Sequence, residues 1–443
     1  MNDILTEPVI RTVLESYFRC NTFVDFQIDS FNLFINNFLP HIILEHSDIY
    51  VSHRGAKVHH QLIIEKVSLG RPSHKELNGT LHLVTPQECR IRGLTYQAPV
   101  FCDILHTVKS IPDSVLADES VTVLERLDSS SWPVLSMKRS REITVCMLPV
   151  MLNSEVCNLY DTTWRREECE LDKGGYFIIR GNEKILQPQE SLRTNHPFIF
   201  STKSTKFAFT CEVRSRYENK YRSTSTLNVM ISAKQGCTSP QILVTIPFLQ
   251  ASVPLMLVCR MLHFDNVETI AAHVYPSVVR ENLGHPDHLQ YRLFRTMLDD
   301  VMAKLPLDTV YEKVAEHGTR MPTKDRKRKY MEHLMSNEFL PHLGLSDSPG
   351  VEKKKMLFLG IVIRKLIAAY VTDKEETFQF DNRDHYGNKR IDTAGMLMAV
   401  LFRQLFRKFV SSLRITIYNL IDSNRAVRLV KNKPFFVSFL DTP

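Results

Sequence analysis

The chain has 443 residues, more than one ordinary domain of roughly 100–200 residues holds. Hydrophobic residues make up 43% and charged residues 24%, which indicates a globular protein and excludes a largely disordered, collagenous or coiled-coil chain. The formal net charge of +7 favours a polyanionic partner. The most apolar stretch, Met356 to Val371, contains Arg364 and Lys365, so a membrane-spanning role is excluded.

The amino terminus and the cysteines both indicate an intracellular protein. The first ten residues lack the basic opening and the apolar centre of a secretory signal. The nine cysteines are odd in number, widely spread and without a C-x-x-C pair. We therefore expect reduced core thiols, in place of a disulfide framework or a zinc ribbon.

The first half of the chain predicts helix, then sheet. Apolar residues recur three to four apart after Asp29 and Ser30, at Phe31, Phe34, Ile35, Phe38 and Leu39. This spacing is typical of a capped amphipathic helix. Short β-branched runs predict sheet over residues 50–83 and later strands at 143–151, 176–179 and 184–186. The last two strands form a hairpin whose predicted turn is Gly181-Asn182.

A separate mixed unit is predicted to begin near residue 200. Strand-like runs are followed by helical periodicity over residues 254–345; the runs lie at 207–213, 226–231 and 241–247. Two further helices are predicted at 353–370 and 393–418, with a polar loop over residues 372–390 between them. The segment Asp422 to Pro443 shows no domain-closing element.

Signatures of self-contained chemistry are missing from the sequence. It contains no P-loop, no G-x-G-x-x-G, no H-E-x-x-H and no G-x-S-x-G motif. An acidic cluster offers oxygen ligands for a hard cation, although clustered acids in a loop are more often solvated; its members are Glu167, Glu168, Glu170 and Asp172. We expect neither a catalytic residue nor a metal site in this chain.

Basic residues beside the glycine-rich stretch Asp172 to Leu186 are the first candidate phosphate ligands. The glycines supply backbone angles that other residues resist, which explains the stretch as pure structure. In the alternative, Arg180 and Lys184 flank a tight turn and present cations to a nucleic-acid phosphate. The residues alone leave both interpretations open.

The loop Asp381 to Arg390 is the second candidate, and it concentrates basic residues around the Gly387-Asn388 turn. Arg383, Lys389 and Arg390 bridge internally to Asp381 and Asp384, or they contact a backbone phosphate. His385 lies in the same loop, but no nucleophile or metal motif accompanies it as a general base. The densest basic run, Arg320 to Lys329, is predicted to form a solvated helix face, with phosphate binding or targeting as the alternative.

Seven ordered motifs resemble the second-largest subunit of multisubunit DNA-directed RNA polymerases. D-K-G-G-Y-F-I-I-R-G-N-E-K-I-L-Q-P-Q-E at Asp172 to Glu190 is similar to the family's G-G-Y-F-I-I-N-G-S-E-K-V-L-x-x-Q-E signature. Pro86 to Pro99 resembles P-x-E-A-R-x-R-x-L-T-Y-x-A-P of the family. The other matches are Asp29 to Phe34, Pro149 to Leu159, Asn337 to Leu343, Lys355 to Leu366 and Asp381 to Gly395. Arg180 and Asn182 depart from the family's usual Asn and Ser.

The resemblance implies an α+β fold with a discontinuous domain. The family's protrusion is a mixed domain built from two separated segments, here about residues 15–195 and 376–443, the second leading toward the fork. An α+β lobe, here about 196–375, is inserted between them. Family members are more than twice this length, so we expect the amino-terminal portion of a split subunit.

The resemblance also implies a role without catalysis by this chain. In such polymerases Mg²⁺ is held by the largest subunit, and two such ions assist attack of the RNA 3′ hydroxyl on a nucleoside triphosphate. This portion is expected to form one jaw of the DNA cleft and to dock other subunits and initiation factors. Expected partners are the largest subunit, the chain carrying the rest of the second-largest subunit, smaller subunits and the DNA template, without a membrane.

Alternatives remain for both function and source. One alternative is a polymerase-derived module that binds nucleic acid or factors without catalysis, and an independent nuclease or phosphotransferase is disfavoured by the missing motifs. The eukaryote-like motifs and the division of the subunit suggest a large DNA virus, with a virion and cytoplasmic viral factory as location. An archaeon with a divided subunit is the second possible source, and the location is otherwise the nucleus or the archaeal cytoplasm.

Overall fold

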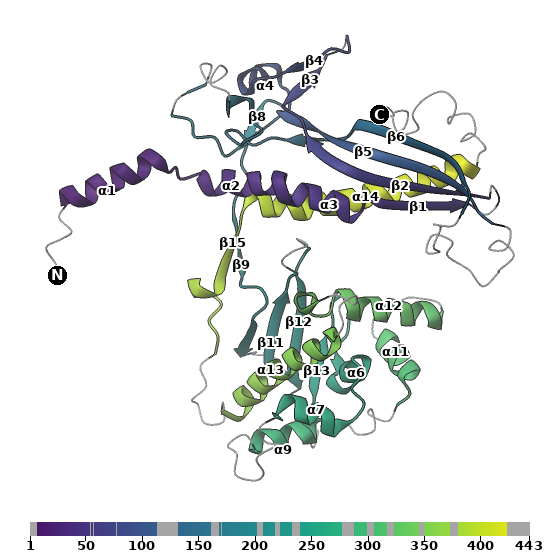
Figure 1. Cartoon of the computed structure of the whole chain (residues 1–443). Helices are drawn as coiled ribbons and strands as arrows, with labels where there is room; N and C mark the ends of the chain where they lie inside the picture. The colour runs from purple at the N-terminus through teal and green to yellow at the C-terminus, as the bar shows by residue number, and fades with distance from the viewer. Residues whose placement is uncertain are drawn as a thin grey trace. The chain divides into compact units, whose positions relative to one another are not determined.

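Two compact units divide the chain in a computed structural model (Figure 1). The structure describes residues 7–53, 55, 57–76, 78–112, 132–160, 168–169, 171–201, 207–217, 222–232, 240–276, 288–298, 305–316, 323–344, 350–372 and 380–422. Unit 1 comprises Met1–Gln189 and Asp392–Pro443, and unit 2 comprises Glu190–Ile391. Both units combine helices with antiparallel sheets, which confirms the α+β class. That they are the protrusion and the lobe stays a prediction.

A long antiparallel sheet forms the centre of unit 1. Its strand order is β1-β2-β5-β6, with β1 at Asp48–His53, β2 at Val58–Leu69, β5 at Gln97–Ser110 and β6 at Val134–Pro149. Alternate side chains such as Leu62 and Ile64 point to one face and are buried, as the period of two in a strand requires. Smaller elements complete the unit: hairpin β3–β4 (Ser73–Lys75 and Leu81–Leu83), helix α4 (Pro86–Arg92), the turn η3 (Asn158–Tyr160) and hairpin β7–β8 (Phe177–Ile179 and Asn182–Lys184).

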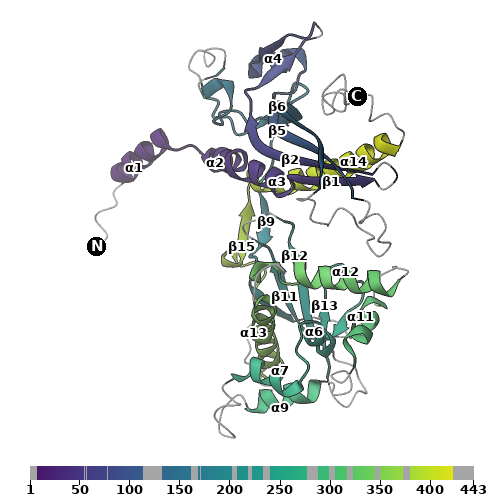
Figure 2. The same cartoon turned by 45° about the vertical axis from the view of Figure 1, so that its right-hand side comes forward.

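Helices from both ends of the sequence pack together, and the third and last of this group contact strands of the sheet (Figures 1 and 2). They are α2 (Asp25–Leu33), the π-turn η1 (Phe34–Phe38), α3 (Leu39–Glu45) and α14 (Ala394–Asp422), whereas α1 (Glu7–Cys20) is exposed along most of its length. The apolar spacing after residue 30 is thus confirmed as helical. The predicted cap is wrong, because α2 already begins at Asp25, and Asp29 and Ser30 lie inside it.

The first turn of α14 is fixed by side chains of α2. Gln27 Oε1 accepts a hydrogen bond from the Ala394 N–H at 2.9 Å, and Ser30 Oγ accepts one from the Gly395 N–H at 3.0 Å. These bonds satisfy amide groups that the start of a helix leaves without an intrahelical partner. A Cβ atom on Gly395 would lie 1.9 Å from the Ser30 carbonyl oxygen. The close approach explains why glycine follows Ala394.

Unit 2 is an antiparallel meander covered by helices. Its sheet runs β10 (Pro197–Ser201), β11 (Phe207–Ser215), β12 (Ser225–Ser232), β13 (Ile242–Thr245) and β14 (Val253–Pro254). The long helix α13 (Val351–Thr372) packs on this sheet. Further helical elements among the described residues are α6 (Leu255–Met261), α7 (Val267–Val274), α9 (His288–Met297), α11 (Leu307–Glu316), α12 (Lys324–Asn337) and the turns η6 (Pro341–Leu343) and η8 (Tyr386–Asn388).

A buried lysine joins two helices of unit 2. Lys355 of α13 is 2% exposed, and its Nζ donates to the carbonyl oxygens of Met335 at 2.6 Å and Ser336 at 3.1 Å. These carbonyls lie in the last turn of α12, where a cation is favoured by the helix dipole. Burial lowers the pKa of Lys355 to about 8. Lys355 therefore serves the structure of the unit.

Candidate nucleic-acid interface

The predicted hairpin around Arg180 is present, with its turn one residue earlier than expected. Strands β7 and β8 pair Phe177 with Lys184 and Ile179 with Asn182, so the turn is Arg180-Gly181. Both turn residues have positive φ, 51° and 76°, as a two-residue hairpin turn of type I′ requires. The sequence pattern placed Asn182 in the turn, but Asn182 begins β8.

Close packing explains the glycines of this stretch. A Cβ atom on Gly174, which has a φ of 73°, would lie 2.6 Å from the Leu152 carbonyl oxygen. One on Gly181 would lie 2.9 Å from the Gly93 Cα atom. Any larger residue at either position must displace backbone. These contacts are the physical reason for the glycines, and they support the structural interpretation.

Arg90 of α4 anchors the same hairpin. Its guanidinium donates to Glu168 at 2.9 Å, to Glu183 of β8 at 2.7 Å and to the Tyr176 hydroxyl at 2.7 Å. The Tyr176 hydroxyl in turn donates to Asp172 at 2.5 Å, and burial together with this bond raises the pKa of Tyr176. Sequence reasoning missed Arg90, although the motif R-I-R-G contains it. Glu168 and Asp172, two members of the acidic cluster, are thus engaged within the protein.

Arg180 and Lys184 project from the hairpin with exposed side chains. The backbone N–H of Arg180 donates to Thr95 Oγ1 at 3.1 Å. This bond fixes the backbone of the turn and does not involve the guanidinium. Within the described part of the chain, no carboxylate lies at ion-pair distance from either side chain. Both cations are therefore available to a phosphate.

Arg383 in the second candidate region is held by its own unit. The chain enters the loop at Asp381, whose carboxylate accepts from the Ile199 N–H at 2.8 Å. Arg383 donates to Glu212 at 2.9 Å, and its guanidinium lies 3.8 Å from the centroid of the Phe200 ring. An internal ion pair is thus present, with Glu212 in place of the expected Asp381 or Asp384. This contact favours a structural role for Arg383.

Lys389 and Arg390 begin the strand β15 (Lys389–Asp392), which pairs with β9 (Gln189–Leu192). Arg390 donates to the carbonyl oxygens of Lys389 at 2.7 Å and Gly387 at 3.3 Å. For Lys389, no ion pair is present among the residues that the structure describes. Of the three cations of this region, Arg383 alone makes an ion pair among the described residues, and Arg390 donates to backbone carbonyls.

His385 acts as a cap of the short turn η8 (Tyr386–Asn388). Its Nδ1 accepts a hydrogen bond from the Gly387 N–H at 3.0 Å, and the residue is exposed. Within the described ranges, His385 makes no ion pair with a carboxylate, and no nucleophile lies beside it. The contact gives His385 a local structural role.

Among the described residues, the side chains that could bind a metal do not gather into a metal site, and the thiols are free. Glu167 and Glu170 lie outside the described residues, and among those described no group of three or more His, Cys, Asp or Glu side chains converges on one point. The described cysteines are free thiols; they are Cys89, Cys102, Cys146, Cys157, Cys169, Cys211 and Cys259. Burial raises the pKa of Cys146 to about 11, as it does for a core thiol.

The basic run at Arg320 to Lys329 forms the start of α12, apart from its first residues, which lie outside the described ranges. Arg328 pairs with Asp308 and Glu332, each at 2.9 Å, and Lys324 pairs with Glu312 at 2.9 Å. Most of this face is exposed. The solvated helix face is therefore the better interpretation.

None of the helices among the described residues is long and apolar enough to cross a membrane.

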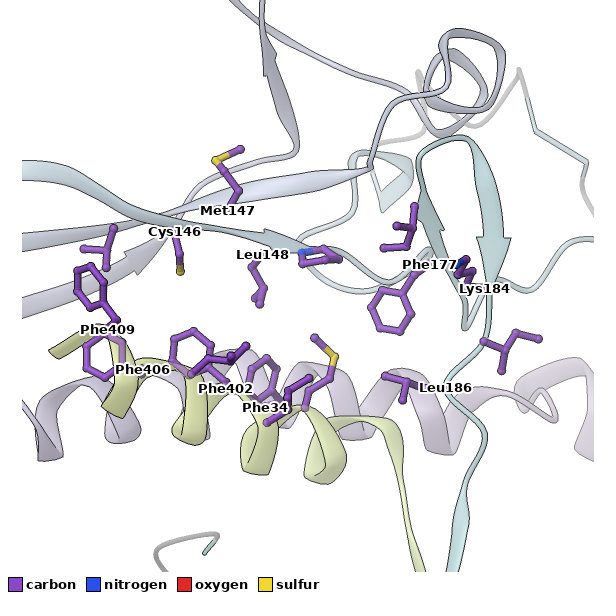
Figure 3. Close-up of a pocket in the computed structure, with 17 residues that line it drawn as sticks. Phe34, Cys146, Met147, Leu148, Phe177, Lys184, Leu186, Phe402, Phe406 and Phe409 are labelled. Atoms are coloured by element: carbon purple, nitrogen blue, oxygen red, sulfur yellow. The ribbon is translucent and has the colours of Figure 1, made fainter. Parts of the chain in front are cut away.

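Sequence reasoning also missed an apolar groove in unit 1, between β6 and α14, which Figure 3 shows in close-up. Its volume is about 550 Å³. The lining residues are Phe34, Val145 to Pro149, Phe177, Ile179, Lys184 to Leu186, Met398, Leu401, Phe402, Leu405, Phe406 and Phe409. The available signal was the composition of α14, which carries apolar side chains on more than one face.

Comparisons with known proteins agree on one family. The family model described as RNA polymerase beta subunit matches residues 22–433. DNA-directed RNA polymerase II subunit 2 of Arabidopsis thaliana is 30% identical over 449 aligned positions, which cover 96% of this chain and 35% of that protein. Subunit RPB2 of Schizosaccharomyces pombe is 28% identical, with 97% and 35% covered.

An archaeal relative is shorter. DNA-directed RNA polymerase subunit Rpo2N of Methanocaldococcus jannaschii is 28% identical over 92% of this chain and 73% of its own length. The chain thus spans about a third of the length of the eukaryotic relatives and corresponds to the amino-terminal portion of the second-largest subunit. The match over nearly the whole chain shows that this protein belongs to the RNA polymerase beta subunit family.

Proposed function

We propose that this chain is one part of the second-largest subunit of a multisubunit DNA-directed RNA polymerase. The observation that carries the proposal is the family match over residues 22–433. The division of the subunit is supported by the relative named Rpo2N, of which this chain covers 73%. The other part of the subunit is then carried by a second chain, and the assembly works inside a cell or a viral particle.

The chain contributes binding and positioning, and the chemistry of RNA synthesis belongs to its partners. In this proposal Mg²⁺ is held by the largest subunit. The chain forms one jaw of the DNA cleft and docks initiation factors and other subunits. Arg180 and Lys184, which are exposed, and Lys389, which is half-buried, are the better candidates for phosphate contacts, because Arg383 and Arg390 have internal partners.

An affinity purification from the native source tests this function. The chain is tagged, its partners are identified by mass spectrometry, and the eluate is assayed for templated RNA extension. Recovery of a largest subunit and of a chain that completes the second-largest subunit, with template-dependent synthesis, supports the proposal. Recovery of the chain alone, without synthesis, would instead support the alternative of a polymerase-derived binding module.

A further inference from the structure

Helix α14 carries two apolar stripes, and unit 1 buries only one of them. The first stripe is at most 8% exposed, and its members follow one another at three to four residues: Phe406, Val410, Leu413, Ile417 and Ile421. The second stripe has the same spacing and consists of Met398, Leu401, Leu405 and Phe409. Leu401 and Leu405 are 56% and 53% exposed. Because an apolar helix face packs against another element, the second stripe indicates a contact that the described part of unit 1 does not supply.

The second stripe lies along one wall of the apolar groove, and β6 forms the other wall (Figure 3). Cys146 and Leu148 point from β6 toward α14, and Phe402 faces them from the helix. β6 is the last strand in the order β1-β2-β5-β6, so no described strand lies beyond it. The groove of about 550 Å³ is therefore an apolar surface of the kind that marks a binding site.

The lining decides which class of partner fits the groove. Of its seventeen residues, Lys184 alone carries a charge, and it belongs to β8, at the end away from Phe409. A nucleic acid needs cations along its path to neutralise the phosphates, and the walls formed by β6 and α14 contribute none to this lining. A protein segment with apolar side chains is the partner whose chemistry matches.

The relatives indicate which protein supplies such a segment. In the eukaryotic relatives, the portion that matches this chain is about a third of one polypeptide. Because that portion is amino-terminal, the rest of the polypeptide follows the part that corresponds to α14, which is the last described element here. Consecutive parts of a polypeptide usually lie side by side. The rest of the second-largest subunit is therefore the partner expected beside α14.

A divided subunit depends on such a surface more than an undivided one does. Where one polypeptide carries both parts, the covalent connection keeps them at a high effective concentration. Where a second chain carries the rest, non-covalent contacts alone hold the two parts together. Permanent interfaces of this kind are large and apolar, like a domain core cut in half. The exposed stripe of α14 and the groove beside it have this character.

We infer that the groove between β6 and α14 binds an apolar segment of the chain that carries the rest of the second-largest subunit. The inference rests on the proposed function and adds the place where the two chains meet. Apolar side chains of the partner pack on Leu401 and Leu405 and fill the space between α14 and Cys146. The cations of the candidate nucleic-acid interface take no part, so Lys184 stays free for a phosphate.

Site-specific photo-crosslinking in the purified polymerase assembly tests the inference. Benzoylphenylalanine is introduced at Leu405 and, as a matched control, at Leu81 of β4, which is 63% exposed in the same unit and does not line the groove. Irradiation should join position 405 to a peptide of the chain that completes the subunit, identified by mass spectrometry. Position 81 should not crosslink to that peptide. Crosslinks from position 405 to residues 423–443 of this chain, to a second copy or to another subunit would overturn the inference, as would no crosslink at all.

Failure of the inference can be told apart from failure of the proposed function. If the purified assembly contains no chain that completes the subunit, or makes no RNA from a template, the proposed function fails and the inference fails with it. If that chain is present and the assembly is active, but position 405 crosslinks elsewhere, the inference alone is wrong.

A charge placed in the groove gives a second readout. Leu405→Asp should reduce recovery of the completing chain with this chain about ten-fold, because an unpaired carboxylate would be buried in an apolar contact. Ser411→Asp adds the same charge at an exposed position of α14 outside the groove and should leave recovery unchanged. Both variants should keep the urea midpoint of the parent chain, since both positions are exposed. Equal recovery in the two variants would contradict the inference.

Discussion

At the scale of single residues, Arg180 occupies a backbone conformation that suits glycine better. Its φ of 51° lies in the left-handed region, which costs a residue with a Cβ atom about 1 kcal/mol relative to glycine. Arg180→Gly should therefore raise the free energy of unfolding by about 1 kcal/mol, measured by urea denaturation. Arg180→Ala removes the same charge but keeps the Cβ atom, so it should give no such gain. A gain of equal size in both variants would assign the effect to charge.

Two neighbouring histidines, one buried and one half-buried, make the stability of unit 1 depend on pH. His60 of β2 and His106 of β5 lie with Nδ1 and Nε2 3.0 Å apart, and their rings stack at 5.3 Å between centroids. Burial lowers the pKa of each to about 4, helped at His60 by His106 and at His106 by Lys138. Both imidazoles are therefore neutral in the folded protein at neutral pH.

The sign of this pH dependence follows from the lowered pKa values. The unfolded chain binds protons on these imidazoles near pH 6.5 and the folded chain only near pH 4, so stability falls as the pH falls through this window. Each imidazole contributes on the order of 3 kcal/mol over the window, at about 1.4 kcal/mol per pKa unit.

The pair can be tested by denaturation at a series of pH values. His60→Gln should flatten the loss of stability between pH 6.5 and 4, because one titrating group is removed and its partner loses a neighbouring charge. The matched control is His41→Gln, since His41 is exposed. A profile for His60→Gln as steep as that of the control would mean that the histidine pair does not carry the effect.

At the scale of elements, the start of α14 depends on close contact with α2. Gly395→Ala would place a methyl group against the Ser30 carbonyl oxygen, which forces backbone movement and costs about 1–3 kcal/mol. The expected result is a lower urea midpoint with an unchanged m-value. Gly93→Ala controls for strain alone, because Gly93 has a φ of 67° and open space around its Cβ position. A loss at Gly395 no larger than at Gly93 would refute the packing argument.

Elements with a strong local pattern were predictable from the sequence, and long-range contacts were not. The helices at 353–370 and 393–418 are confirmed within a few residues as α13 and α14, because their apolar spacing is continuous. The turn of the β7–β8 hairpin was displaced by one residue, since Arg180 accepts a positive φ that composition assigns to Asn. The cap at Asp29 and Ser30 was wrong because α2 already begins at Asp25, and Ser30 instead accepts from the Gly395 N–H, 365 residues away.

The same limit applies to the candidate site. Sequence shows which residues are basic, but an ion pair depends on which carboxylate the fold brings near. Arg383 meets Glu212, 171 residues away, and no local pattern indicates this contact. Arg180, Lys184 and Lys389 could be selected as the better candidates for phosphate contacts only after the internal partners of the other cations were known. The groove was hidden for a related reason, because it forms from β6 and α14, which are distant in sequence.

At the scale of the whole molecule, the chain passes from unit 1 to unit 2 and back, at residues 189–190 and 391–392. Each unit has its own sheet and buries its own apolar residues. In the polymerase assembly proposed above, the affinity for DNA would rest largely on phosphate contacts and would therefore be sensitive to salt. Loss of a single phosphate contact should then be measurable in the complete assembly.

The last prediction concerns Lys389 within that assembly, purified from its native source. Lys389→Ala should weaken DNA retention and reduce the slope of log affinity against log salt by about 0.9, the value for one phosphate contact on a duplex. Lys324→Ala is the matched control, because it removes the same charge from a lysine that pairs with Glu312. If both variants reduce the slope equally, net charge explains the result; if neither does, Lys389 has a structural role and DNA binding by this region is refuted.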